Sequence, residues 1–444
     1  DGVVKITAAI SSLMDEPEQI SPVCPYVNEI AGLIGECKAL CEEKINCALS
    51  LKHYHQLAML NNIASTLKDE NARENRFMLA ETTHLLSTMI GKSATFIFEK
   101  IGTEIDHIFI DEFQDFYRVN PSIYSDMQNI WDSYKSKAHI NLIVAGSVNT
   151  LMNKIFKDKK QPLFGRQTDT IHVRPFKPSV LKEIMSEYCP GYKKSDLLAL
   201  YTLTGGVAKY VELFIDKKKF TEKKMMDMFF EQDSYFLSEG KNMLVDEFGK
   251  DYSIYFSILT LIAQGKNTRS ELESTLNTKE LSGYLKNLSE EYGLISKMQP
   301  IYEKSNNKNV HYAINDQFLK FWFRFIYKYS HIIEAGGNDR LRAIAERDFA
   351  TFSGKSLESY FYEVLKESGA YTRLGYWHDR KGENEIDIIA EDELGDKIEF
   401  IEVKRQAKNF DENVLKNKSA LFLKAVGTFK EYDIIYKGLS IEDM

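Results

Sequence analysis

A short apolar run that ends in two carboxylates places the strongest constraint on this chain. Residues 107–112 read His-Ile-Phe-Ile-Asp-Glu, which predicts a β-strand that leads into Asp111 and Glu112. In the Walker B arrangement, the aspartate holds Mg²⁺ through water and the glutamate polarises the attacking water. Asp111 is therefore a candidate metal and cofactor ligand, and Glu112 is a candidate catalytic residue. An apolar strand that happens to end in acids is an equally simple interpretation.

Three later segments extend this pattern. Asn141–Ala145 also reads as a buried strand, and the small polar Ser147 follows it, where a sensor would touch the γ-phosphate of ATP. Arg166 comes after a glycine and could stabilise the charge on a transferred phosphate. Thr170–Val173 reads as a third strand, and strands that alternate with helices favour a parallel α/β sheet.

The glycine-rich loop that would hold the phosphates is missing. No GxxxxGK[ST] pattern occurs, and the Gly-Lys-Ser that precedes the acidic pair, at Gly91–Ser93, has Leu86 where the first glycine belongs. A phosphate cradle turns backbone N–H groups inward, which glycine permits. Residues 1–95 read as a helical segment without such a loop, so ATP binding is an open question for this chain. The cysteines and histidines of this segment fit no zinc module, and buried free thiols are the simpler interpretation.

Residues 251–315 predict a different unit. The pattern gives three helices followed by two strands around a polar tip: Tyr252–Gln264, Thr268–Leu276, Lys279–Tyr292, Leu294–Pro300 and Val310–Ile314. This is the order of a winged helix, a helix-turn-helix variant. The third helix would read DNA, although its acidic residues leave it close to neutral, and winged helices also dock proteins. Both roles stay open.

The last segment, 351–444, carries a second set of acids. Glu358 lies on a predicted helix, Asp387 on a predicted strand, and Glu402 and Lys404 on the next strand. Residues two apart on a strand face the same side of a sheet. Two carboxylates there can bind Mg²⁺ for phosphodiester attack, and a lysine can stabilise the charged transition state. Asp387 and Glu402 are the predicted metal ligands, and Glu358 and Lys404 the predicted catalytic residues.

Composition narrows the class of protein. The chain has 57 basic and 65 acidic residues, a net charge of −8, which disfavours coating bulk DNA or an anionic membrane by charge alone. No uncharged apolar stretch of about 20 residues is present, and no signal-peptide pattern is visible. Five cysteines are too few for a disulfide scaffold. We expect a cytoplasmic protein without a membrane partner.

Several segments together resemble the prokaryotic AAA-like ATPases of the "archaeal ATPase" group, Bacteroides type, that carry a C-terminal restriction-endonuclease-like domain. The segments are FIDEFQDF (109–116), NLIVAGS (141–147), PLFGRQT (162–168), LTGGVAKY (203–210), FWFRFIYKY (321–329), DRKGENEIDIIA (379–390) and FIEVKRQ (400–406). The resemblance covers roughly residues 98–444. Family members carry a P-loop ahead of the DEF segment, and this chain departs from them there.

The resemblance implies a multidomain α/β protein. Its parts would be an incomplete P-loop-NTPase-like parallel sheet with a helical lid (96–250), a winged helix (251–315), a helical connector (316–350) and a restriction-endonuclease-like domain (351–444). The implied cofactors are ATP and Mg²⁺, and the implied partners are DNA and further copies of the chain. Residues 1–95 do not match the family.

Two functions follow from these patterns. The first is an ATPase-derived protein that processes DNA, in a defence or mobile-element setting, with a nuclease-like site. The alternative is a non-catalytic regulatory or adaptor protein that uses the winged-helix and nuclease-like folds for binding only. The missing P-loop and the net charge favour the alternative, whereas the intact Glu402-x-Lys404 pattern favours the first. Geometry separates them, because a catalytic site needs Asp387, Glu402 and Lys404 to converge with Glu358 nearby.

Overall fold

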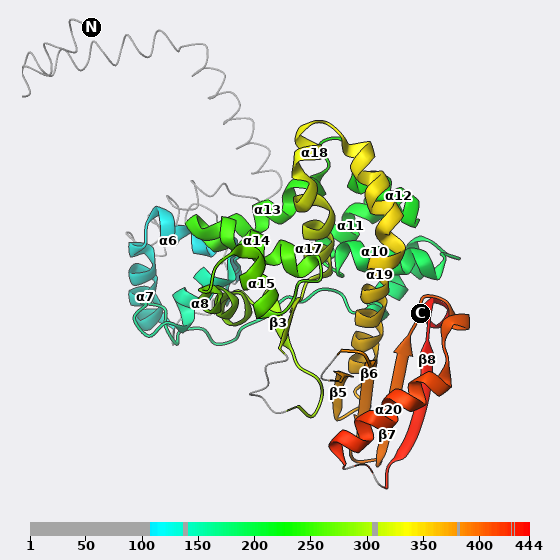
Figure 1. Cartoon of the computed structure of the whole chain (residues 1–444). Coiled ribbons are helices and arrows are strands. Elements are labelled where there is room, and N and C mark those ends of the chain that lie inside the picture. Colours follow the sequence, from blue (N-terminus) through cyan, green and yellow to red (C-terminus); the bar gives the residue numbers. More distant parts are fainter. Residues whose placement is uncertain (1–106, 136–140, 304–309, 380–381, 428, 430) are drawn as a thin grey trace, which may run out of the picture. The chain divides into compact units, whose positions relative to one another are not determined.

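The computed structural model describes residues 107–135, 141–303, 310–379, 382–427, 429 and 431–444 (Figure 1). The chain separates into two compact units, 1–107 with 129–141, and 108–128 with 142–444. The first unit has only His107, 129–135 and Asn141 among the described residues, so the account below concerns the second unit. The predicted helical segment 1–95 and its Gly91–Ser93 lie outside the described residues. The protein is mixed α/β, mostly helical, with small sheets.

A two-stranded sheet follows the N-terminal segment. It pairs β1 (His107–Ile110) with β2 (Asn141–Val144), and α6 (Phe116–Val119), α7 (Ser122–Tyr134) and α8 (Asn149–Lys157) accompany it. Backbone pairing continues past the strands, since the amide of Ala145 donates to Ile110 O and that of Phe113 donates to Ala145 O, both at 2.8 Å. Phe113 is fully buried and packs edge-on against Tyr124. The backbone after the two acids is therefore fixed.

The predicted third strand, Thr170–Val173, is wrong. These residues have no regular structure, and the side chains of Ile171 and Val173 are 84% and 92% exposed. An apolar run becomes a strand only where a neighbouring strand accepts its hydrogen bonds and a core covers one of its faces. Neither is present at this segment within the described part of the chain. The expected parallel sheet is therefore reduced to two strands among the described residues.

A helical body comes next, in the region where the resemblance implies a helical lid. Its helices are α9 (Pro178–Tyr188), α10 (Lys194–Thr204), α11 (Ala208–Asp216), α12 (Glu222–Phe229) and α13 (Tyr235–Phe248). Every residue of α10 from Asp196 to Thr204 is buried, which marks it as the central helix of this body. It ends at Gly205, whose φ of 59° is the left-handed conformation that closes a helix without a side-chain clash.

The predicted order of three helices and two strands is confirmed. The elements are α14 (Tyr252–Ala263), α15 (Arg269–Leu276), α16 (Leu281–Lys286) with a π-helical turn over Asn287–Glu291, β3 (Ile295–Met298) and β4 (His311–Ile314). Strands β3 and β4 are antiparallel. Thr268 and Glu271 form a capping box at the start of α15.

An aromatic helical segment links this unit to the last sheet. It comprises α17 (Gln317–Phe321), a π-helical turn (Trp322–Ile326), a short 3-10 turn (Tyr327–Tyr329), α18 (Ser330–Glu334) and α19 (Asn338–Ser368). Four phenylalanines of the segment are fully buried in the main core: Phe318, Phe321, Phe323 and Phe325. The expected division between 350 and 351 falls inside α19, which runs unbroken for 31 residues.

The last sheet has four strands in the order β5-β6-β7-β8 (Figure 1). They are β5 (Arg373–His378), β6 (Glu385–Asp392), β7 (Lys397–Val403) and β8 (Asp433–Leu439), and α20 (Glu412–Val426) lies between β7 and β8 in the chain. Strands β7 and β8 are parallel, and the other neighbours are antiparallel. The sequence pattern located β6 and β7 but missed β5, whose Arg-Leu-Gly-Tyr-Trp-His run does not alternate cleanly.

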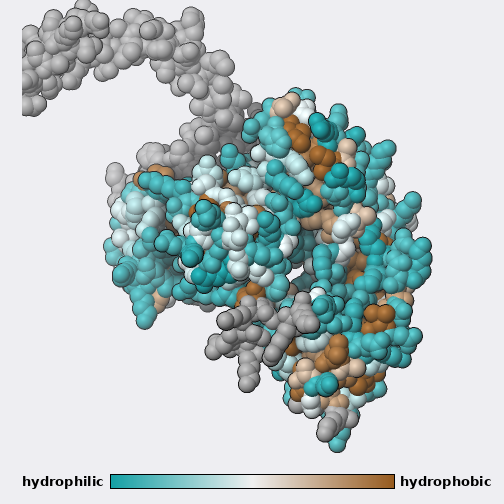
Figure 2. All heavy atoms as spheres, viewed as in Figure 1, coloured by the Kyte–Doolittle hydropathy of each residue, from teal (hydrophilic) through white to brown (hydrophobic). Residues whose placement is uncertain are grey.

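Figure 2 shows a largely hydrophilic surface on which apolar side chains form small separate groups. No described helix combines the length and the apolar character that a membrane crossing requires. Isolated exposed apolar residues such as Val414 and Leu421 on α20 are ordinary for a protein surface.

The segment after β3 is joined to the last sheet through Ile301. Its amide donates to Tyr376 O on β5 at 2.8 Å, and its side chain is 8% exposed within the second core, which includes Trp377 and Ile386. We predict that Ile301→Ala lowers the free energy of unfolding by about 2–4 kcal/mol, because it removes buried methyl groups and leaves a cavity. Urea denaturation measures this change.

Ile171→Ala is the matched control, since Ile171 is 84% exposed, and it should change the unfolding free energy by less than about 0.5 kcal/mol. Equal losses in the two variants would contradict both the burial of Ile301 and the exposed loop at 170–173.

Lys320 on α17 generates a second prediction. Burial lowers its pKa to about 8, although the charges of Asp316 and Glu358 act in the opposite direction. The folded state therefore binds fewer protons than the unfolded state, whose lysine pKa is roughly 10.4. The penalty for a charged Lys320 is full below pH 8 and disappears as the pH rises toward 10.4. Lys320→Met should raise the unfolding free energy by about 1–2 kcal/mol at pH 7.

This gain should shrink between pH 8 and pH 10, which urea denaturation at pH 7 and pH 9.5 would reveal. Lys241→Met is the control, because Lys241 is exposed on α13. It should leave the unfolding free energy unchanged at both pH values. A gain that does not change with pH would show that packing, and not charge, is responsible.

Candidate functional site

The predicted acids of the last segment lie on neighbouring elements. Asp387 is on β6 and Glu402 is on β7, which pair so that Ile388 stands opposite Ile401. Continuing this register by one position places Asp387 opposite Glu402, on one face of the sheet. Glu358 reaches the same place from α19, a helix that contacts β6.

Asp387 is held by backbone and charge together. Its Oδ2 accepts a hydrogen bond from the amide of Val403 at 2.8 Å. Burial raises the pKa of Asp387 and the carboxylate of Glu402 adds to this, whereas the Val403 amide, Lys404 and Lys355 lower it; the net direction is upward. An acid with a raised pKa beside another acid favours a nearby cation.

Glu402 is only 8% exposed and contacts two lysines. Its Oε1 lies 2.7 Å from Nζ of Lys404, the predicted neighbour two positions along β7. Nζ of Lys418, on α20, lies 3.0 Å from Oε1 and 3.2 Å from Oε2. The sequence pattern did not identify Lys418, because nothing in the spacing of a helix shows which strand it will cover.

Glu358 also contacts a lysine that sequence reasoning missed. Nζ of Lys355 lies 3.0 Å from Oε2 of Glu358, one helical turn along α19, and 3.5 Å from Oε1 of Glu385. Burial raises the pKa of Glu358 to about 7; Lys355 opposes this shift and the charge of Asp387 adds to it. The spacing of three residues in Lys355-x-x-Glu358 could have suggested the pair.

The structure therefore brings the four predicted residues together. The charges of Asp387, Glu402 and Glu358 all act on Lys404 and raise its pKa, against the effect of burial. Lys404 is thus held in its charged form beside the carboxylates. The catalytic and metal-binding roles of these residues remain predictions, since position alone does not establish chemistry.

The donor set suits a hard divalent cation, because carboxylate oxygens are the ligands that Mg²⁺ prefers. As arranged, however, no three His, Cys, Asp or Glu residues among those described are grouped so that they could hold a metal. Lysine ammonium groups occupy the carboxylates instead, on Glu402 and on Glu358. The chemistry of the site fits Mg²⁺, and side-chain rotation of these lysines would be needed to admit it.

The earlier acidic pair forms a second cluster. Oε2 of Glu112 accepts hydrogen bonds from Ser147 Oγ at 2.7 Å, from the Ser147 amide at 3.3 Å and from Gln114 Nε2 at 2.5 Å. Burial would raise the pKa of Glu112, but these donors outweigh it and lower the pKa. Glu112 adopts a left-handed backbone conformation, with φ of 48°, and its amide donates to Asp111 Oδ1 at 3.0 Å.

Ser147 and Glu112, predicted to share one site, are thus in direct contact. Arg166 is held in its own turn, where Nη1 donates to Pro162 O at 2.7 Å and to Phe164 O at 3.2 Å. The turn includes Gly165 at a φ of 68°. The phosphate-binding candidate Gly91–Ser93 lies outside the described residues.

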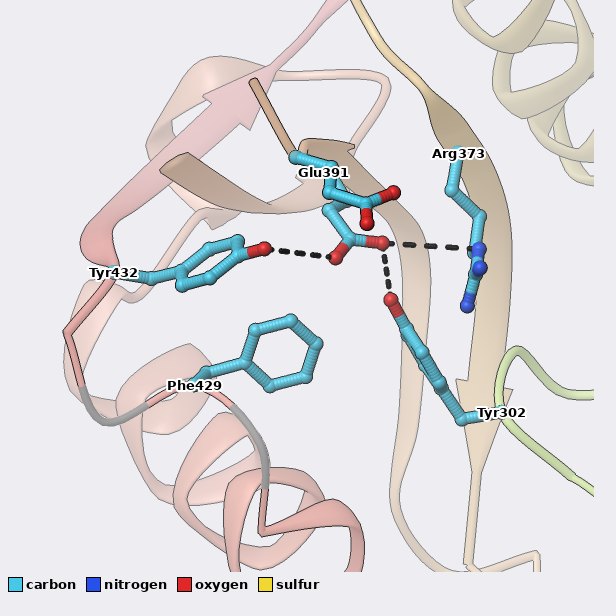
Figure 3. Close-up of a pocket in the computed structure, with 6 residues that line it drawn as sticks. Tyr302, Arg373, Glu391, Phe429 and Tyr432 are labelled. Atoms are coloured by element: carbon cyan, nitrogen blue, oxygen red, sulfur yellow. Dashed lines mark hydrogen bonds and ion pairs between the residues drawn. The ribbon is translucent and has the colours of Figure 1, made fainter. Parts of the chain in front are cut away.

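A cavity of about 210 Å³ lies where the segment after β3 meets β5 and β6 (Figure 3). Glu391, 5% exposed, accepts hydrogen bonds there from the hydroxyl groups of Tyr302 and Tyr432 and lies 3.7 Å from Nε of Arg373. The Arg373 guanidinium also stacks 4.5 Å above the Tyr302 ring. The polar groups of the cavity thus bind one another, and through Tyr302 they join the segment after β3 to the last sheet.

Comparison with known proteins bears on the same region. The family model DUF234, described as archaea bacterial proteins of unknown function, matches residues 322–417. That segment contains Glu358, Asp387, Glu402 and Lys404. Among solved structures, the Walker-type ATPase PABY2304 of Pyrococcus abyssi is similar with a TM-score of 0.38 and 20% identity, over 56% of this chain and 69% of that one. A likeness at this level assigns no activity.

A second protein is more similar in sequence. The uncharacterized protein MJECL04 of Methanocaldococcus jannaschii is 32% identical over 314 residues, which cover 67% of each chain. Identity at this level over most of both proteins reflects a common fold and ancestry. The chain therefore belongs to the same protein family as the Methanocaldococcus jannaschii protein.

Proposed function

We propose that the protein cleaves phosphodiester bonds of nucleic acid, with Mg²⁺, at the carboxylates of the C-terminal sheet. The observation that carries this proposal is the meeting of Glu358, Asp387, Glu402 and Lys404 from α19, β6 and β7 at one place. The element order α19, β5, β6, β7, α20, β8 also agrees with the restriction-endonuclease-like fold that the sequence resemblance implies.

The roles follow from the charges. Asp387 and Glu402 would hold the cation, with Glu358 beside them. Bound Mg²⁺ supplies Lewis-acid chemistry and lowers the pKa of a coordinated water. Lys404 stays protonated, because its contacts with Glu402, Asp387 and Glu358 outweigh burial and raise its pKa. Its ammonium can therefore stabilise negative charge that develops on a phosphate.

The three helices α14 to α16 and the β3–β4 hairpin support a nucleic-acid substrate for this site. They follow the winged-helix order, and the third helix, α16, exposes Ser282 and Lys286 to solvent. Lys286 lies 3.9 Å from Glu290, and Lys297 on β3 lies 3.8 Å from the same acid. Such exposed pairs are weak and can exchange for a phosphate contact. We propose that this face contacts the nucleic-acid backbone.

ATP hydrolysis is a weaker candidate. The contact between Glu112 and Ser147 favours it, because it places a carboxylate and a hydroxyl group at the ends of two paired strands. Yet three donors already engage the Glu112 carboxylate, and no P-loop pattern occurs in the sequence. ATP binding, Mg²⁺ at Asp111, assembly with further copies and a defence or mobile-element role stay predictions.

Substitutions in the carboxylate site test the proposal. Asp387→Asn and Lys404→Met should each lower the Mg²⁺-dependent cleavage rate of a labelled DNA or RNA substrate by about 10²–10³-fold, because each removes charge that stabilises the transition state. Glu412→Gln is the matched control, since Glu412 forms only a surface pair with Lys416 on α20. That variant should cleave at the wild-type rate.

The alternative function predicts a different pattern. A regulatory or adaptor protein would bind nucleic acid or a partner equally well in all three variants and would show no Mg²⁺-dependent cleavage in any of them. Cleavage that survives in both Asp387→Asn and Lys404→Met would remove the assignment of the active site.

A further inference from the structure

Lys418 contacts both oxygens of a carboxylate that we propose as a metal ligand. Its Nζ lies 3.0 Å from Oε1 and 3.2 Å from Oε2 of Glu402, whereas Lys404 contacts Oε1 alone. Glu402 is 8% exposed, so little water competes for its oxygens. The carboxylate is thus already occupied by cations that belong to the chain itself.

The fold sets where this lysine can reach. Helix α20 buries Leu415, Ser419 and Phe422, which fix its backbone against the last sheet. Lys418 precedes Ser419, and its side chain is 18% exposed. The backbone is therefore rigid while the four-carbon stem can still rotate, so the ammonium can leave Glu402 without any change in the fold.

We propose that Lys418 is an internal counter-ion that closes the carboxylate site until a divalent cation displaces it. This inference rests on the proposed function, because it takes Glu402 to be a metal ligand. With the cation bound, the ammonium of Lys418 is released from Glu402 and is available to a phosphate of the nucleic acid. The site then opens when the divalent cation and the polyanion arrive together, since the polyanion takes the displaced positive charge.

The physical basis is competition for one carboxylate. A cation that binds Glu402 must break the contacts of Lys418, so the apparent affinity for the metal is lower than the carboxylates alone would give. Removing the ammonium removes this competitor and leaves the acids in place. Metal affinity should then increase, in contrast to a residue that helps to hold the metal, whose loss lowers affinity.

The experiment is a titration of the full chain with Mn²⁺, without nucleic acid, in which free Mn²⁺ is counted by electron paramagnetic resonance. Lys418→Met should bind Mn²⁺ more tightly, by about three- to tenfold. Lys418→Gln should behave in the same way, and it keeps the proposal testable if the methionine variant folds poorly. Lys418→Arg preserves the charge and should match wild type.

Lys424→Met is the control, because Lys424 is exposed on the same helix. Its Mn²⁺ affinity should also match that of wild type. Circular dichroism of each variant serves as the check of folding. Suppose that Lys418→Met and Lys418→Gln bind Mn²⁺ no more tightly than wild type, while Asp387→Asn loses Mn²⁺ binding. This result would overturn the counter-ion role of Lys418 and would leave the proposed metal site standing. If no variant binds detectable Mn²⁺, including Lys418→Met and Lys418→Gln, both the counter-ion role of Lys418 and the proposed metal site are overturned.

Discussion

The packing of α19 is the interaction on which the candidate site depends. Its first half buries Leu341, Ala345 and Phe349 in the main core, so the helix is fixed before it reaches the sheet. Arg405, just after β7, then donates to the hydroxyl of the buried Ser353. One turn further on, Glu358 is carried to Asp387. The position of this acid is thus set by apolar contacts along the whole helix, because Leu357 and Tyr360 beside it are also buried in the main core.

Charge balance explains why three acids can stand so close. Burial raises the pKa of both Glu358 and Asp387, and the charge of a neighbouring carboxylate, Asp387 for Glu358 and Glu402 for Asp387, adds to this. Lysines from three elements offset it: Lys355 on α19, Lys404 after β7 and Lys418 on α20. A purely structural ion-pair cluster would need no such concentration of like charges on one face. The proposed exchange of these internal cations for external ones starts from this balance.

The sequence predicted the structure correctly where the repeat of side chains along a single strand or helix determines it. Alternation along a strand predicted that Glu402 and Lys404 share a face, and the apolar pattern of residues 252–314 predicted the order of three helices and two strands. It failed where distant partners decide. Thr170–Val173 has strand-forming residues, but no strand in the described part of the chain pairs with it. Lys418 acquires its contact only when α20 packs on the sheet. By contrast, the sequence did place Glu112 and Ser147 in one site, because each follows a strand of the same sheet.

The residues that match the family model contain both the acids of the candidate site and the helix that positions one of them. The match begins at Trp322 in the aromatic segment and ends at Asn417 in α20, so it spans α19 and the strands that carry the acids. The buried phenylalanines Phe321, Phe323 and Phe325 of the aromatic segment belong to the same core as the first half of α19. Anchor and acids must vary together, because a shift of α19 by one residue would rotate Glu358 by roughly 100° away from the sheet. The matched region thus contains α19 together with the strands that carry Asp387 and Glu402.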